Sequence, residues 1–238
     1  MDTELLTVVI ITLAFFAQSV FGFGGGLISI PLISLFYPVA EAVTLVLIFQ
    51  LLMGLLIVKT YKQTRWNVVL PLIFGICIGV FIGMAFLTSF EEKTLRLVLA
   101  SSILVYLLKS LAFPKMSVKD TGKSTSFVFG VIGGIFQGII GTGGPVFVMF
   151  LSAALKDARE IRAGVIFLLV ASNVLRISIS AAAGLITEQV VSIATITIAP
   201  FLIAIFAGQL VHTKVSQKAY RYCIYAILFC SSISLVFK

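Results

Sequence analysis

The amino-acid sequence predicts an all-α polytopic membrane protein made of two homologous inverted repeats. Of its 238 residues, 60% are hydrophobic and only 11% are charged, whereas a soluble domain is about 45–50% apolar and about 25% charged. Apolar runs of about 20 residues, the length that crosses a hydrocarbon core, recur along the whole chain. The third observation is an internal repeat. Each repeat is predicted to be a glycine-broken helix followed by three transmembrane helices.

The repeat becomes visible when the chain is aligned with itself at a shift of 119 residues, which places Gln18 on Gln137. Further matches follow in the same order, and near the end of each repeat the shift becomes 125. The matched pairs are Gly22 with Gly141, Gly24 with Gly143, Gly25 with Gly144, Glu41 with Glu160, Gly83 with Gly208, Lys93 with Lys218 and Arg96 with Arg221. An ordered set of this kind predicts one repeat over residues 1–119 and another over 120–238.

Prolines, glycines and charged segments divide each repeat into four elements. The expected elements of the first repeat are 4–37, 41–60, 67–88 and 93–113, and those of the second are 126–155, 160–184, 189–211 and 218–237.

The first element of each repeat contains the glycine break. Residues 4–37 are too long for one crossing, and the ten residues from Leu27 to Phe36 rise only about 15 Å as a helix. The element therefore either crosses once as a broken helix or returns as a re-entrant hairpin. Re-entrance in both repeats would place 13 of the 17 Lys and Arg residues on one face, whereas single crossings divide them 10 to 6. The positive-inside rule favours re-entrance, and an odd number of crossings per repeat makes the repeats inverted.

The glycines predict a ligand site inside the membrane. Irregular backbone at membrane depth is tolerated where it is buried in protein or lines a cavity, and a helix N-terminus that follows such a break attracts anions. The candidate anion-binding residues are Gly24, Gly25, Gly26, Gly143, Gly144 and Pro145. The alternative is that glycines only let helices pack closely. We expect that role for Gly75, Gly79 and Gly83, which would suit an internal helix contact or a homodimer.

A second signal is the segment ASNVLRISIS, residues 171–180, in the middle of a long apolar run. Ser172, Arg176 and Ser180 share one helical face with Asn173 beside them. A charge at membrane depth usually faces a cavity, so Ser172, Asn173 and Arg176 are candidate substrate-binding residues. The alternative is that Arg176 snorkels to the interface or pairs with a helix C-terminus.

Gln18 and Gln137 precede the two breaks by four residues. Each could hydrogen-bond a ligand oxygen or could cap backbone carbonyls that the break leaves free. Both are retained as candidate substrate-binding residues.

Several classes of function are disfavoured. Cys77, Cys223 and Cys230 are isolated in apolar runs, which gives no redox pair and no metal site. The formal net charge of +8 reflects short basic loops rather than a nucleic-acid surface. The sequence contains no nucleotide-binding motif and no acidic residue in the middle of a predicted helix. We therefore expect no catalytic activity and no cofactor.

The segments AQSVFGFGGGLISIPLI and FQGIIGTGGPVFVMFL resemble the paired motifs of the sulfite exporter TauE/SafE family. The resemblance covers the length, the duplication and the spacing of apolar segments over the whole chain. It implies a multi-pass secondary transporter of the bacterial inner membrane that moves sulfite, sulfonates or related organosulfur anions, usually outward.

These observations predict a transporter of a small anion that works by alternating access, and the resemblance implies that the anion is a sulfur oxyanion and that it is exported. The anion would bind at the midplane between the two repeats, and the partners of the protein would be this anion and membrane lipid. The alternative is a channel for small anions or neutral solutes, in which the glycines would form a filter.

Overall fold

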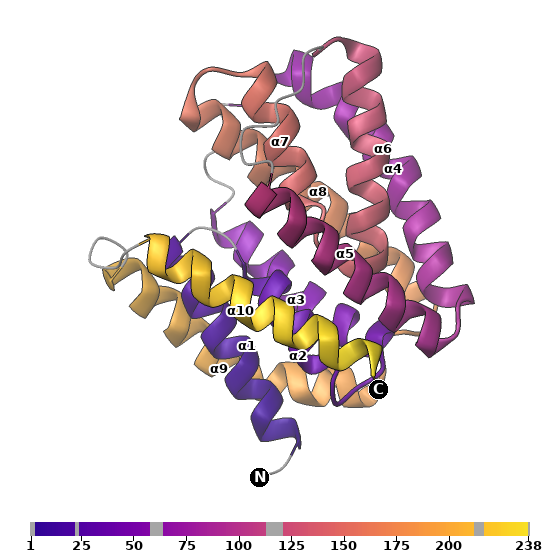
Figure 1. Cartoon of the computed structure of the whole chain (residues 1–238), viewed down its shortest axis with the longest axis vertical. Coiled ribbons are helices and arrows are strands. Elements are labelled where there is room, and N and C mark those ends of the chain that lie inside the picture. Colours follow the sequence, from indigo (N-terminus) through magenta and orange to yellow (C-terminus); the bar gives the residue numbers. More distant parts are fainter. Residues whose placement is uncertain (1–2, 22–23, 58–63, 113–120, 212–216, 238) are drawn as a thin grey trace. The chain divides into compact units, whose positions relative to one another are not determined.

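The computed structural model describes residues 3–21, 24–57, 64–112, 121–211 and 217–237. Within these ranges the backbone forms ten α-helices and no strand (Figure 1). The all-α fold class expected from the sequence is therefore confirmed.

The same pattern of helices occurs twice along the chain: one long helix, one short helix and three long helices. The first five are α1 (Thr3–Phe21), α2 (Gly25–Ile33), α3 (Val39–Ile57), α4 (Trp66–Ser89) and α5 (Glu92–Ala112). The next five are α6 (Lys123–Ile140), α7 (Gly144–Ala154), α8 (Ala158–Ala182), α9 (Glu188–Val211) and α10 (Gln217–Val236). Each glycine-broken element is thus one long helix followed by one short helix, at bounds close to those expected.

The described helices confirm a polytopic membrane protein. Six of them are long and apolar enough to cross a bilayer, namely α1, α3, α4, α6, α8 and α9. The short helices α2 and α7 have 9 and 11 residues, which rise only about 14 and 17 Å. Whether the broken elements return to their starting side, and whether the two repeats are inverted, stay predictions.

The chain folds into two compact units. Unit 1 comprises residues 1–48, 90–114 and 184–238, and unit 2 comprises 49–89 and 115–183. Helix α4 thus belongs to unit 2 with α6, α7 and α8, while α9 belongs to unit 1 with α1 and α2. The predicted boundary between residues 119 and 120 concerns the sequence repeat and stays a prediction.

In unit 1, α1 packs closely along α9 (Figure 1). The Ser19 hydroxyl donates a hydrogen bond to the Ile205 carbonyl at 2.7 Å. The rings of Phe15 and Phe201 meet edge to face with centroids 5.2 Å apart, a favoured arrangement for buried aromatic pairs. A Cβ at Gly208 would lie only 2.6 Å from the Ser19 Cβ, so α9 can approach α1 this closely because residue 208 is glycine.

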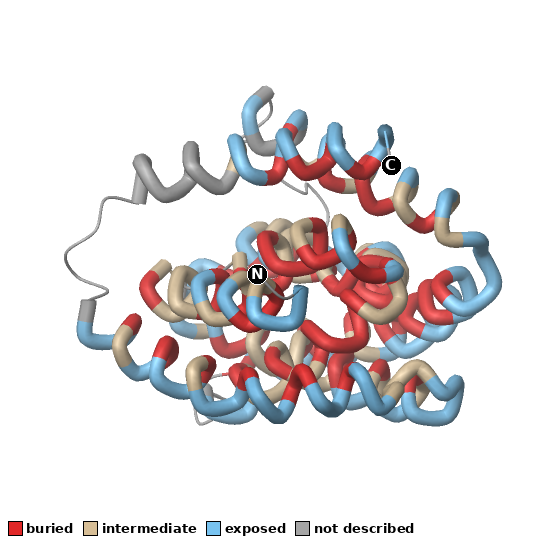
Figure 2. The backbone as a smooth tube through the Cα atoms, turned by 90° about the horizontal axis from the view of Figure 1, so that it is seen from below, coloured by how far each residue is buried: buried red, intermediate tan, exposed pale blue. Residues whose placement is uncertain are grey.

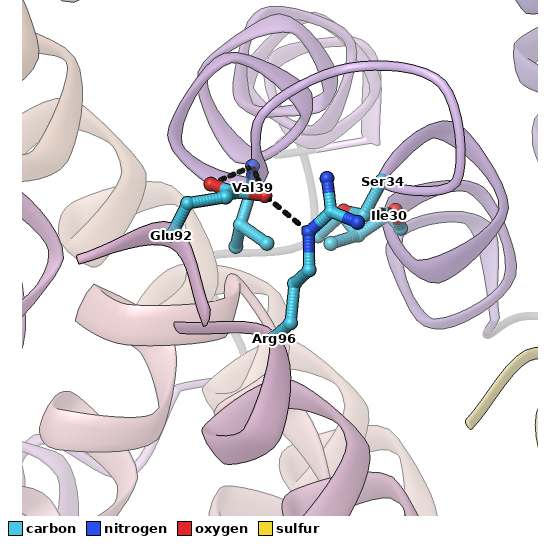
Figure 3. Close-up of polar contacts among 5 residues, drawn as sticks. All are labelled: Ile30, Ser34, Val39, Glu92 and Arg96. Atoms are coloured by element: carbon cyan, nitrogen blue, oxygen red, sulfur yellow. Dashed lines mark hydrogen bonds and ion pairs between the residues drawn. The ribbon is translucent and has the colours of Figure 1, made fainter. Parts of the chain in front are cut away.

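A charged pair on α5 holds the corner between α2 and α3 in unit 1 (Figure 3). The Glu92 carboxylate accepts the Val39 N–H at 3.0 Å and also accepts the Arg96 Nε–H at 2.6 Å. The Arg96 guanidinium lies beside Ile30 and Ser34 at the end of α2 (Figure 3). The anion thus meets a helix N-terminus and the cation a helix C-terminus, as the helix dipoles favour. This pair connects α5 to the start of α3, beside the end of α2.

In unit 2, α4 and α6 pack backbone to backbone through a glycine seam. The seam consists of Gly75, Gly79 and Gly83 on α4 and Gly130, Gly134 and Gly138 on α6. A Cβ at Gly79 would lie 2.9 Å from the Gly134 Cα and would overlap the Val131 carbonyl oxygen. Of the two roles left open for the α4 glycines, the structure shows the internal helix contact.

Individual helices carry buried residues on one side and exposed residues on the other (Figure 2). The exposed sides are apolar, and the most exposed of their large side chains include Ile203 at 69% and Leu210 at 82%. A soluble protein rarely exposes such continuous apolar surface. These faces suit contact with lipid.

An ion pair joins the segment before α4 to the first turn of α8 in unit 2. Arg65 Nε donates to Glu160 Oε1 at 2.8 Å. This hydrogen bond and the charge of Glu160 raise the pKa of Arg65 above its ordinary value. Because the Arg65 side chain is 64% exposed, the pair contributes little to stability. Glu160 and its sequence counterpart Glu41 both lie in the first turn of a helix, where a carboxylate is favourable.

Candidate functional site

The break between α6 and α7 places a helix N-terminus among buried side chains of unit 2. Helix α6 ends at Gly141, whose φ of +69° is left-handed and favours glycine. Its N–H donates to the Gln137 carbonyl at 3.0 Å. Helix α7 starts at Gly144, and Pro145 occupies its first turn, where the missing N–H costs nothing. The N-terminus of α7 is therefore well formed and carries a partial positive charge.

Gln137 holds this break together. Its side chain is completely buried, and Oε1 accepts the Gly143 N–H at 2.6 Å. Its Nε2 donates to Asn173 Oδ1 on α8 at 2.8 Å. The sequence left open a ligand oxygen or a freed carbonyl as partner. The structure shows instead that the glutamine accepts a freed N–H group and ties it to α8.

Arg176 lies at the other end of the same network. Its side chain has no exposed surface, and Nη1 donates a long hydrogen bond of 3.4 Å to Asn173 Oδ1. Among the residues that the structure describes, no acceptor is found for Nε or Nη2. A guanidinium without exposed surface does not snorkel to the interface, whereas pairing with a helix C-terminus stays the other part of this alternative.

The helical face predicted from the sequence is buried as a whole. Ser172, Asn173 and Ser180 are at most 2% exposed, like Arg176. The Ser172 hydroxyl donates to the Leu169 carbonyl of its own helix at 2.9 Å. This leaves Asn173 as the residue that links α8 to the break, while Ser172 adds a buried hydroxyl to the face.

A buried charge with unmatched donors is costly unless a partner binds it. Arg176 offers two free donor atoms, and a network through Asn173 and Gln137 connects it to the start of α7. Planar guanidinium donors and a helix N-terminus both favour an oxyanion. These groups match the chemistry of a small oxyanion, and an anion site in this part of unit 2 stays a prediction.

The first break has a similar cap but a different set of neighbours. Gly24 precedes α2 with a φ of +110°, which only glycine adopts readily. Gln18 Oε1 accepts the Gly25 N–H at 2.8 Å, and a Cβ at Gly25 would overlap that oxygen. Gly26 is buried beside it. The residue that aligns with Arg176 is Ile57, which provides no cation. Gly22 lies outside the described residues.

The sequence-predicted site residues divide between the two units. Gln18, Gly24, Gly25 and Gly26 lie in unit 1. The others lie in unit 2, namely Gln137, Gly143, Gly144, Pro145, Ser172, Asn173 and Arg176. Each group is brought together within its own unit. A single midplane site that uses both groups stays a prediction.

The sequence marks Gln50 only as a weaker candidate for lining a cavity, and the structure places it at the second break. Its Nε2 donates to the Gly141 carbonyl at 3.0 Å. The signal in the sequence is weak: Gln50 is an amide within an apolar run, and the repeat alignment gives it no polar counterpart, since the aligned residue is Leu169.

An apolar cavity of about 360 Å³ lies between α5 and α10 in unit 1. Its lining residues are Leu104, Leu107, Leu108, Leu111, Tyr225 and Phe229. This lining offers an anion no charged partner, so the cavity is not the candidate site.

We expect Gln137→Leu to destabilise the protein by about 2 kcal/mol, because it leaves the Gly143 N–H and the Asn173 oxygen unpaired in the interior. Gln18→Leu is the matched control, and it removes one hydrogen bond at a half-buried side chain. The free energy of unfolding in mixed detergent micelles would measure both. Equal losses in the two variants would contradict the bridging role of Gln137.

Comparisons with known proteins identify the family of the chain. The family model described as "Sulfite exporter TauE/SafE" matches residues 7–235. A "Probable sulfite/organosulfonate exporter TauE" from Cupriavidus necator is 29% identical over 199 residues, which cover 81% of this chain and 77% of that protein. No solved structure matches. Because the family match spans nearly the whole chain, the protein belongs to the sulfite exporter TauE/SafE family.

Proposed function

We propose that the protein is a secondary transporter that exports sulfite or an organosulfonate across the bacterial inner membrane by alternating access. One observation carries the proposal. Arg176 is a completely buried cation whose Nε and Nη2 have no acceptor among the described residues. A membrane protein retains such a group where a ligand satisfies it.

The chemistry around Arg176 favours an oxyanion that can present two oxygens to the guanidinium. Two guanidinium donors can bind two oxygens of the same anion. The start of α7 adds a positive potential, and the Gln137–Asn173 hydrogen bond holds this helix end against α8. The sulfur oxyanion is suggested by the family and by the printed name of the relative from Cupriavidus necator.

Alternating access is supported by the broken helices, which many secondary transporters use to bind substrate at membrane depth. The sequence contains no nucleotide-binding motif, so an ion or substrate gradient would supply the energy. Arg176 would stay unpaired in the empty carrier and become paired when the anion binds. The free-energy difference between the empty and the anion-bound carrier can favour an occluded state when the anion is bound.

Flux measurements with purified protein in proteoliposomes test this function. We expect saturable uptake of radiolabelled sulfite that depends on an imposed pH gradient, and counterflow when the vesicles are preloaded with unlabelled sulfite. Protein-free liposomes are the control for passive leakage.

Two results would contradict the proposal. Non-saturating flux without counterflow would favour the channel over the carrier. An absence of flux with sulfite and with a panel of organosulfonates would exclude this substrate class.

A further inference from the structure

A second unmatched polar atom lies at the same break as Arg176. Gln50 Nε2 donates to the Gly141 carbonyl, which fixes the amide beside the end of α6. Its other end, Oε1, is buried, and no donor reaches it from the described residues. Gln50 belongs to unit 2, like Gly141, Gln137 and Arg176. The break therefore offers unused donors and one unused acceptor.

The Arg176 donors and the Gln50 acceptor require different groups on a ligand. An oxyanion that carries only acceptor oxygens satisfies the Arg176 donors but gives nothing to Gln50 Oε1. A buried acceptor left without a hydrogen bond weakens binding. A ligand that satisfies both side chains must carry a donor as well as a negative charge.

The charge balance of this part of unit 2 favours one negative charge. Residues 49–57, 66–89, 124–155 and 163–183 contain a single charged side chain, Arg176. A monoanion is neutralised by one guanidinium, whereas a dianion leaves an unpaired negative charge in a low-dielectric site.

We propose that the site selects a monoanion that carries one hydrogen-bond donor, and that Gln50 recognises this donor. The inference rests on the proposed function and specifies its substrate further. O-protonated hydrogensulfite and hydroxyl-bearing sulfonates have this chemistry, whereas the sulfite dianion and plain alkanesulfonates do not. Arg176 binds the sulfur-bound oxygens, and Gln50 Oε1 accepts the ligand O–H.

The charge preference is tested through the pH dependence of transport in proteoliposomes. The KM for total sulfite should rise at alkaline pH in proportion to the loss of the monoanion, because the dianion does not bind. Ethanesulfonate stays a monoanion throughout, so its KM should stay constant. The described ionisable groups of α3, α4, α6, α7 and α8 in these ranges are Arg176 and the exposed Cys77. A change in the protonation of either group would alter both KM values, so the ratio of the two KM values reports the charge of sulfite.

The donor preference is tested with hydroxymethanesulfonate and ethanesulfonate, which are similar in size and differ by a hydroxyl group in place of a methyl group. We expect the wild-type protein to have an about three- to tenfold lower KM for the hydroxyl compound. In Gln50→Met the KM ratio should fall to about one. A general structural defect would raise both KM values together and leave their ratio unchanged. Gln209→Met, at an exposed glutamine of α9, should keep the wild-type ratio.

The outcomes separate this inference from the proposed function. If all these anions are transported and the KM for sulfite does not change with pH, the monoanion preference is wrong and the proposed exporter function is unaffected. A wild-type ratio of one, or a ratio that survives in Gln50→Met, would overturn the role of Gln50. A wild-type protein that transports none of these anions would refute the proposed function and this inference with it.

Discussion

Replacing Arg176 with methionine should abolish anion transport and at the same time leave the protein as stable as before or more stable. Methionine has a similar length and no charge, and it removes two donor atoms that have no acceptor among the described residues. Exchanging a buried charge for an apolar side chain of similar size is often neutral or stabilising. The free protein therefore loses little when the guanidinium is removed.

The loss of transport should be at least about 100-fold in kcat/KM, because two charge-assisted hydrogen bonds to the anion disappear together. Arg176→Lys should retain part of the activity, since it keeps the charge but loses the planar fork of donors. Arg162→Met is the matched control, because this arginine is exposed near the start of the same helix.

Proteoliposome flux and thermal unfolding in detergent, measured on the same preparations, distinguish the two roles of Arg176. A purely structural arginine would give a protein that unfolds at a lower temperature and transports in proportion to the folded fraction. A stable Arg176→Met protein with wild-type flux would place the anion elsewhere.

The helical elements could be predicted from the sequence because hydrophobic length and glycine or proline breaks are local signals. The candidate residues Gly24 to Gly26 and Gly143 to Pro145 were expected at the breaks, and α2 and α7 begin at Gly25 and Gly144. The Gly75, Gly79 and Gly83 stripe indicated close packing, but its partner could not be identified. The partner stripe on α6 lies about 50 residues away along the chain, and a single sequence does not reveal which helices pair.

The candidate site was predicted in part. The buried face of Arg176 followed from the energetic cost of a charge at membrane depth. The role of the glutamines did not follow, because Oε1 and Nε2 can each serve a backbone group or a ligand. Only the positions of Gly143 and Asn173 show that Gln137 joins two helices. The hydrogen bond from Gln50 to this break could not be predicted either, since nothing in the sequence relates Gln50 to Gly141 across 91 residues.

Replacing Gly79 with leucine should cause the largest loss of stability of any change in the glycine seam. Gly79 occupies the middle position of the α4 stripe, and its missing Cβ lets the Val131 carbonyl and the Gly134 Cα approach. These are backbone atoms of a helix and cannot move aside as a flexible side chain would. Overpacking a buried contact typically costs about 1–3 kcal/mol, so a clash with rigid backbone should cost at least about 3 kcal/mol.

A graded pair of substitutions makes this prediction specific. Gly79→Ala should lower the free energy of unfolding less than Gly79→Leu does, because a small shift of α4 away from α6 can accommodate a methyl group. Ala85→Leu, on the exposed side of the same helix, should leave the unfolding free energy unchanged, since this side chain extends away from α6. Unfolding in mixed micelles would measure all three. The flux of Gly79→Ala should fall as well, because α6 carries Gln137 next to Gly138, the last glycine of the seam. If Gly79→Leu proved as stable as Ala85→Leu, the backbone contact between α4 and α6 would not hold unit 2 together.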